Sequence, residues 1–348
     1  MKDKKHHLET IERILAKKKE LGDELLILTH HYQRREIVEL GDYRGDSFDL
    51  SRKAAQSSAG RIVFCGVHFM AESARILCGE HQTVQIPDEA AGCWMSDMAD
   101  HVMVQRAWDE LVRVVPEENV MPVTYMNSDA VIKAFCGQKG GIVCTSSNAG
   151  KAFEWGFEQR EKIFFFPDQH LGQNTANQMG VPAERVIIWD PEKPLGGNSP
   201  QAVKRAGVIL WKGYCLVHTR FTVAQMESMR EKNPGSKIVV HPECTQAVVN
   251  IADAVGSTSY IVNFVEKAAP GSRIIIGTEI NLVKRLATEH TDKTVLPLYD
   301  SLCPNMYKIS PEKLLETLEK PEKNLVSVPG DVQARAVLAL ERMLSLPA

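Results

Sequence analysis

The sequence lacks paired cysteines, long apolar runs and an excess of charge of either sign, and each absence excludes a class of protein. Its eight cysteines include no C-x-x-C pair, which argues against a zinc ribbon, a thioredoxin-type site and a local ferredoxin cluster. No uncharged apolar run reaches the roughly 18 residues of a membrane-spanning helix. The 41 basic and 44 acidic residues give a net charge of −3, so no basic field indicates binding to nucleic acid or to an anionic membrane.

The first residues also lack the apolar segment of a signal peptide, because the charged stretch 1–7 is not followed by one. We therefore expect a cytoplasmic protein, in which thiols stay reduced. Any cysteine site must then be assembled from distant parts of the chain. The 348 residues are enough for a sizeable core and two or three domains.

Three related α/β units are predicted from a repeated order of apolar strand, polar turn and helix. First strands are expected at 25–29, 120–124 and 237–240. Second strands are expected to end at Cys65, Thr145 and Ser257, and third strands follow 22, 22 and 20 residues later, near Pro87, Pro167 and Gly277. These gaps suit the helix and strand of a parallel βαβ step.

We place the units at residues 1–116, 117–233 and 234–320, with a C-terminal helix within 321–348 that packs back on the body. The stretch 41–47 is an apparent insertion between the first two strands of the first unit. Because departures from a repeat are often functional, we predict that it forms a loop that closes over the site.

Polar clusters directly follow the first strand of each unit, at 30–33, 125–128 and 241–244. Ligands of open parallel sheets bind beyond the carboxyl ends of the strands. Units arranged about a pseudo-threefold axis would therefore bring the clusters to one cavity. One such cluster can simply close a strand, but imidazole, phenol, amide and carboxylate groups gathered at one pole favour a site.

One cysteine lies in an irregular stretch after the third strand of each unit: Cys93, Cys215 and Cys303. Any single cysteine is readily explained as a small buried apolar residue. Three thiolates, one per unit, would suit iron or zinc and would leave one metal position open for catalysis. The spacing permits this set of three without selecting it.

Eleven short segments, in order, resemble the quinolinate synthase family of bacterial NAD biosynthesis, and the resemblance covers roughly residues 25–306. The segments are HHYQ (30–33), GDS (45–47), FCGVHFMAE (64–72), YMN (125–127), TSSNA (145–149), FPD (166–168), GYCLVH (213–218), HPEC (241–244), GSTS (256–259), GTE (277–279) and CPNM (303–306).

The resemblance implies an α/β fold of three pseudo-symmetric three-layer αβα domains, with short parallel sheets around a central active-site funnel. It implies one [4Fe–4S] cluster per chain, held by Cys93, Cys215 and Cys303, with the fourth iron open to substrate. The implied reaction joins iminoaspartate to dihydroxyacetone phosphate and forms quinolinate with loss of phosphate and two waters. L-aspartate oxidase would be a functional partner, as the source of iminoaspartate.

The resemblance also implies residue roles. Glu243 and Tyr32 would take part in the dehydration and proton steps, and Tyr125 would position substrate near the open iron. His30 and His218 complete the candidate catalytic set, His218 either as a base or as support for the cluster. The candidate substrate-binding residues have polar side chains at strand ends or predicted helix starts. Anions bind at helix starts, although hydroxyls there can also act as caps. These residues are His30, Ser47, Tyr125, Asn127, Ser146, His241, Glu243, Ser257 and Thr258.

Two features depart from the family pattern. Only Cys303 is present where some members carry C-x-x-C-x-x-C, and His31 stands where the family often has Asn. Two alternatives also remain open: a non-catalytic binder of dicarboxylates, and a mononuclear metal lyase or aldolase with His30, His218, His241 and Glu243 as ligands. The remaining cysteines are expected to be structural: Cys65, Cys78, Cys136, Cys144 and Cys244.

Overall fold

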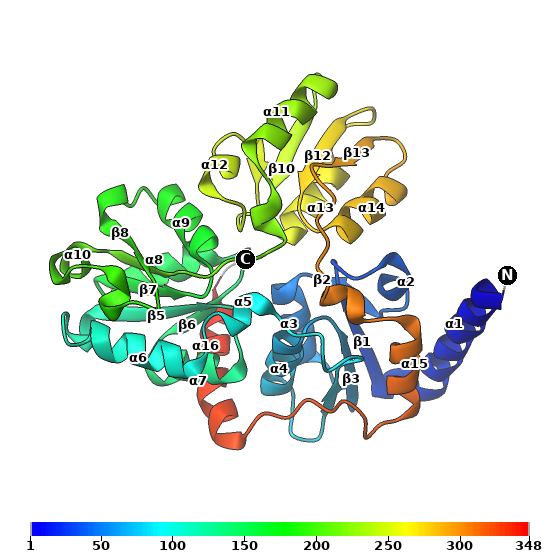
Figure 1. Cartoon of the computed structure of the whole chain (residues 1–348). Helices are drawn as coiled ribbons and strands as arrows, with labels where there is room; N and C mark the ends of the chain where they lie inside the picture. The colour runs from blue at the N-terminus through cyan, green and yellow to red at the C-terminus, as the bar shows by residue number, and fades with distance from the viewer. Residues whose placement is uncertain (1, 347–348) are drawn as a thin grey trace.

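The computed structural model describes residues 2–346 and contains three separate sheets arranged around a common centre (Figure 1). Every strand pair within these sheets is parallel. Parallel sheets need helical crossovers that cover their faces, which explains why the central strands are largely apolar and almost completely buried. The predicted α/β fold class is confirmed.

The first sheet has the order β2-β1-β3-β4. Its strands are β1 (Leu25–His30), β2 (Tyr43–Gly45), β3 (Arg61–Cys65) and β4 (Thr83–Gln85). Its helices are α1 (Lys2–Leu21), α2 (Arg35–Val38), α3 (Ser47–Gln56), α4 (His68–Leu77) and α5 (Trp94–Asp97).

The second sheet has five strands in the order β6-β5-β7-β9-β8. They are β5 (Val120–Tyr125), β6 (Ile142–Cys144), β7 (Lys162–Phe166), β8 (Val186–Trp189) and β9 (Val208–Trp211). The accompanying helices are α6 (His101–Leu111), α7 (Ala130–Gln138), α8 (Ala149–Gln159), α9 (Gln169–Gln178) and α10 (Pro200–Arg205).

The third sheet has the order β11-β10-β12-β13. Its strands are β10 (Lys237–Val240), β11 (Ala254–Val255), β12 (Arg273–Gly277) and β13 (Thr294–Pro297). Its helices are α11 (Val223–Lys232), α12 (Gln246–Val249), α13 (Thr258–Lys267) and α14 (Ile280–Glu289).

Two C-terminal helices return to the earlier parts of the chain (Figure 1). Helix α15 (Pro311–Glu319) packs beside α1, and α16 (Gly330–Ser345) packs on α7. The close approach of α16 requires Gly137 on α7, because a Cβ atom there would lie 1.8 Å from the carbonyl oxygen of Arg335. Within residues 2–346 no helix combines the length and the apolar character needed to cross a membrane.

The strand order corrects the predicted repeat. In each sheet the central strand (β1, β5, β10) pairs with a short edge strand (β2, β6, β11) on one side and with β3, β7 or β12 on the other. The stretch 41–47 therefore contains the counterpart of β6 and β11, and is not an insertion. Leu28, Thr29 and His30 pair with the three residues of β2, so this stretch is part of the sheet rather than a free lid. The prediction was wrong because β2 is short and its first two residues are exposed.

The strand order also corrects which strand precedes each cysteine. Cys215 follows β9 and Cys303 follows β13, two strands that the sequence analysis did not predict. Cys93 follows β4, which occupies the same place in its sheet as β9 and β13 do in theirs. The three cysteines therefore lie at equivalent positions of the three units.

Candidate active site

The three cysteine segments have the same backbone hydrogen bonds. In each unit the first N–H of a helix donates to the carbonyl oxygen two residues before the cysteine, at 2.8–2.9 Å: His68 to Ala91, Gln169 to Gly213, and Ile280 to Ser301. Each cysteine carbonyl accepts at 3.1 Å from the N–H four residues later, that of Asp97, Thr219 or Tyr307. Three sheets thus present three thiols through one repeated local structure.

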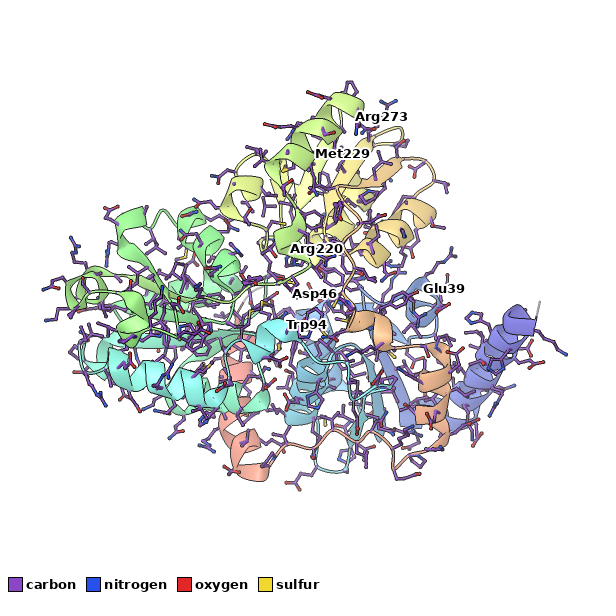
Figure 2. All side chains as sticks on the ribbon, in the orientation of Figure 1. Glu39, Asp46, Trp94, Arg220, Met229 and Arg273 are labelled. Carbon is purple, nitrogen blue, oxygen red and sulfur yellow. The ribbon has the colours of Figure 1, made fainter. Side chains whose placement is uncertain are left out.

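These cysteines border the same cavity, which is lined by residues of all three units. Figure 2 labels two of its other lining residues, Asp46 and Trp94, where the three units meet. Of the predicted site residues, all but one line this cavity: Cys93, Cys215, Cys303, His30, Tyr32, Ser47, Tyr125, Asn127, Ser146, His218, His241, Glu243 and Thr258. Ser257 does not line it and caps α13 instead, accepting from the Tyr260 N–H at 3.2 Å.

Burial keeps the thiols of the three cysteines protonated in the absence of a cation. Burial raises the pKa of Cys93 to about 12 and that of Cys303 to about 11. Burial, the charge of Glu243 and the two other thiols raise the pKa of Cys215 well above its usual value. Because a bound cation stabilises thiolates, iron at this position would offset these effects.

The three cysteines have the chemistry of cluster ligands. All three are free and border the same cavity, and among the described residues their sulfurs do not form a set whose atoms all lie within 4.8 Å. Ligands of one tetrahedral zinc ion approach that closely, whereas ligands of a four-iron cluster bind separate irons. Three free thiols on one cavity are a donor set that a [4Fe–4S] cluster can use.

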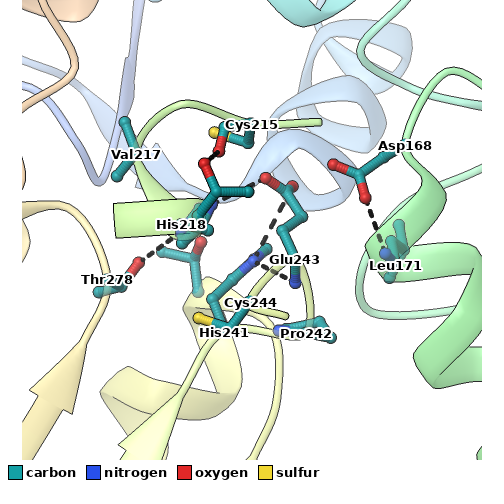
Figure 3. Close-up of polar contacts among 12 residues, drawn as sticks. Asp168, Leu171, Cys215, Val217, His218, His241, Pro242, Glu243, Cys244 and Thr278 are labelled. Atoms are coloured by element: carbon teal, nitrogen blue, oxygen red, sulfur yellow. Dashed lines mark hydrogen bonds and ion pairs between the residues drawn. The ribbon is translucent and has the colours of Figure 1, made fainter. Parts of the chain in front are cut away.

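Glu243 belongs to a group of hydrogen-bonded side chains from all three units, of which Figure 3 shows Glu243, His218 and Thr278. Its Oε1 accepts a hydrogen bond from the Tyr125 hydroxyl at 2.5 Å, and its Oε2 accepts one from His218 Nδ1 at 2.8 Å. The other ring nitrogen of His218 lies 3.1 Å from Thr278 Oγ1 and 3.4 Å from the Tyr32 hydroxyl. Tyr32 and Thr278 are themselves joined at 2.8 Å. A continuous chain of groups that exchange protons thus runs along the cavity wall.

The ionisation states of these hydrogen-bonded side chains follow from their burial and from one another's charges. Burial and the negative charge of Glu243 raise the pKa of Tyr32 and of Tyr125 well above 10.0, so both phenols keep their protons. Burial also raises the pKa of Glu243, but His218 and the hydrogen bonds from His218 and Tyr125 outweigh that effect and lower it. The site therefore combines an ionised carboxylate with two protonated phenols.

Two histidines face the cavity as neutral rings. Burial lowers the pKa of His30 to about 4 and that of His241 to about 3. In each ring Nδ1 accepts from a backbone N–H two residues later, that of Tyr32 at 3.2 Å and that of Glu243 at 3.4 Å. The proton of each ring must then reside on Nε2, which makes both rings hydrogen-bond donors without charge.

Three hydroxyls come from equivalent places, just after the edge strands and near the starts of α3, α8 and α13: Ser47, Ser146 and Thr258. Helix starts carry partial positive charge and favour anions. The sequence analysis missed Asp46, which caps α3 and accepts from Ser147 Oγ at 2.9 Å, and Thr278. The GDS and GTE segments contain both residues, and their positions after parallel strands were the available signal.

His31 does not line the cavity. Its side chain is buried, and its Nδ1 accepts a hydrogen bond from Arg285 Nη2 on α14 at 2.9 Å. Arg285 also pairs with Glu289 at 2.8 Å, and Glu289 pairs with Arg44 on β2 at 2.8 Å. The residue that departs from the family pattern therefore joins the first unit to the third, outside the cavity.

A second donor set overlaps the first. Cys215, His218 and Glu243 each place one ligand atom within 4.8 Å of the others. Both ring nitrogens of His218 already have hydrogen-bond partners in Glu243 and Thr278. These contacts favour a proton-transfer role for His218 over a role as a metal ligand.

Comparison with known proteins agrees with this geometry. The family model described as "Quinolinate synthetase A protein" matches residues 12–345. The quinolinate synthase of Herpetosiphon aurantiacus is 47% identical over 344 residues, which cover 96% of this chain and 92% of that protein. Quinolinate synthases of a Nocardioides species and of Corynebacterium glutamicum are 49% and 48% identical, over 97% and 96% of this chain and 89% and 86% of those proteins. The chain belongs to the quinolinate synthase family, the enzymes that make quinolinate for NAD biosynthesis.

Proposed function

We propose that this enzyme condenses iminoaspartate with dihydroxyacetone phosphate and releases quinolinate, phosphate and two waters. The atoms of this conversion balance without an external oxidant or reductant. L-aspartate oxidase would supply the iminoaspartate. One observation carries the proposal: three cysteine segments with the same two backbone hydrogen bonds border the same cavity as the hydrogen-bonded groups Tyr125, Glu243, His218 and Tyr32.

Cys93, Cys215 and Cys303 would hold one [4Fe–4S] cluster. When bound, the cluster supplies an iron without a protein ligand, a Lewis acid for an oxygen of the substrate. The protein groups around it then have two tasks, which are to hold two anionic substrates and to move protons.

Anion binding falls to neutral donors. Ser47, Ser146 and Thr258 offer hydroxyls close to helix starts, and His30 and His241 offer neutral Nε2–H groups. Such donors bind carboxylate and phosphate groups. Because none of them carries a full positive charge, they do not hold the product dianion as strongly as a cluster of arginines would.

Proton transfer falls to the chain around Glu243. Its ionised carboxylate accepts protons, and the Tyr125 and Tyr32 phenols, whose pKa values are raised, donate them to leaving hydroxyl groups. His218 bridges Glu243 to Tyr32 and Thr278. His218 can therefore carry a proton between Glu243 and Tyr32 between successive steps of the reaction.

Anaerobic iron and sulfide analysis of Cys215→Ala tests the ligand assignment. The unaltered enzyme should contain about four irons and four sulfides per chain and should release phosphate only when both substrates are present. Cys215→Ala should lose the iron, the brown colour and the activity. The matched control is Cys144→Ala, because Cys144 lies buried in β6 away from the cavity and should keep all three. A brown, fully active Cys215→Ala enzyme would contradict the proposal.

The second donor set defines a second candidate function, a mononuclear metal lyase built on Cys215, His218 and Glu243. It predicts a colourless protein with one metal ion per chain and no sulfide. The same analysis separates the two candidates. Tight dicarboxylate binding without phosphate release would instead indicate a binding protein.

A further inference from the structure

Two buried acids outside the cavity occupy equivalent positions. Asp168 follows β7 and caps α9, and Glu279 follows β12 and caps α14. Both side chains are completely buried, and neither lines the cavity or takes part in the chain around Glu243. The corresponding residue after β3 is Val67, which caps α4 without a side-chain hydrogen bond.

Glu279 connects a helix start to a cysteine. Its Oε2 accepts from the Asn281 N–H at 2.7 Å, which is the capping contact. Its Oε1 accepts from Asn281 Nδ2 at 3.0 Å and from the backbone N–H of Cys303 at 3.3 Å. A cap needs only the first of these bonds. The contact with Cys303 therefore serves something other than the helix.

Asp168 shares the capping contact of Glu279 but not its contact with a cysteine. Its Oδ1 accepts from the Leu171 N–H at 2.7 Å, as Figure 3 shows. Its buried Oδ2 has no hydrogen-bond partner in the part of the chain described. The contact between an acid and a cysteine backbone is therefore a feature of Glu279 and Cys303.

We propose that Glu279 is a positioning residue that holds the backbone of Cys303 for binding of the cluster. The inference rests on the proposed function, since it assumes that Cys303 is a ligand. Cys303 lies on an irregular segment, and ligands held in place before the metal arrives bind it more tightly. Among the described residues the other two units have no such contact, because Val67 stands at the equivalent position of the first unit and the Asp168 side chain makes no hydrogen bond to Cys215.

Two substitutions of Glu279 separate positioning from capping. Glu279→Ser keeps a good capping oxygen for the Asn281 N–H but is too short to reach Cys303. Glu279→Gln keeps the full length and one oxygen acceptor. The measurements are iron per chain after anaerobic purification and the rate at which cluster absorbance is lost in excess chelator.

We expect Glu279→Ser to lose its cluster about tenfold faster than the unaltered enzyme, in line with the usual effect of residues that orient metal ligands. Glu279→Gln should stay close to the unaltered enzyme. The control is Asp100→Ala, which removes an acidic cap from α6, where Asp100 accepts from the Met103 N–H at 2.9 Å and does not line the cavity. Its cluster should decay at the unaltered rate.

Cluster retention by Glu279→Ser equal to that of the unaltered enzyme would overturn the inference, because capping alone would then explain the residue. Absence of a four-iron cluster from the unaltered enzyme would instead contradict the proposed function. Circular dichroism of the metal-free variants separates loss of fold from loss of cluster. Should Glu279→Ser fail to fold, Glu279→Asp decides between positioning and capping by the same two measurements, because aspartate keeps a capping carboxylate but is one methylene too short for the contact with Cys303.

Discussion

Replacing Lys133 with methionine tests how much the burial of its charge lowers the free energy of unfolding. Lys133 on α7 is fully buried, its ammonium donates to the carbonyl of Ser128, and it lies 5.5 Å from the centre of the Phe69 ring. Ser128 Oγ in turn donates to the carbonyl of Tyr125 at 2.8 Å. The lysine thus supports the segment that carries Tyr125, but it must do so without contact with bulk water.

The size of the effect follows from the pKa. Burial lowers the pKa of Lys133 from 10.5 to about 8, although Glu72 and Asp129 act in the opposite direction. A pKa difference of this size between the folded and the unfolded chain corresponds to about 3 kcal/mol in the free energy of unfolding. As the pH rises from 8 towards 10.5, the folded lysine has lost its proton while the unfolded one still binds it. The free energy of unfolding should therefore gain about 3 kcal/mol from this group across that window.

Urea unfolding of the metal-free chain measures this contribution as a difference. The free energy of unfolding of the unaltered chain minus that of Lys133→Met should rise with pH by about 3 kcal/mol across the window. Titration of other groups cancels in the difference. Lys151→Met, on the exposed start of α8, is the control for the loss of a lysine outside the core. A constant difference for Lys133→Met would refute the assignment of a depressed pKa to this lysine.

Three further substitutions have definite expected outcomes. Glu243→Gln should keep the cluster but lower kcat by at least about 100-fold, because an amide cannot accept the proton; unchanged steady-state quinolinate formation would dismiss the role of Glu243. Gly137→Ala should lower the free energy of unfolding by about 3 kcal/mol or more, since its Cβ would clash with the α16 backbone, whereas Gly150→Ala, with nothing within 4 Å of its Cβ, should not. His31→Ala should cost about 1–3 kcal/mol in urea unfolding, because it leaves the buried Arg285 guanidinium with one partner fewer; equal stability of His31→Ala and the unaltered chain would show that the contact contributes nothing.

Much of the fold and the site follows from local patterns. The strands at 25–30, 120–125 and 237–240 are apolar runs because parallel strands are covered on both faces. The polar residues that follow them must lie at the carboxyl ends of the sheets, and His30, Tyr125 and His241 accordingly line the cavity. Ser257 was misplaced because a hydroxyl at a helix start serves equally well as a cap or as a ligand contact, and sequence does not distinguish the two.

By itself the sequence determined the alternation of strands and helices, the family, and which polar side chains stand at the ends of the central strands. Only the tertiary structure decided which strands are equivalent, because β2 has three residues and β8 is partly exposed, which leaves no periodic signal. The tertiary structure alone also joined Tyr125 to Glu243, 118 residues apart, and turned His31 away from the cavity towards Arg285, 254 residues apart. Contacts of this kind depend on how the three units pack together, and local periodicity carries no record of that packing.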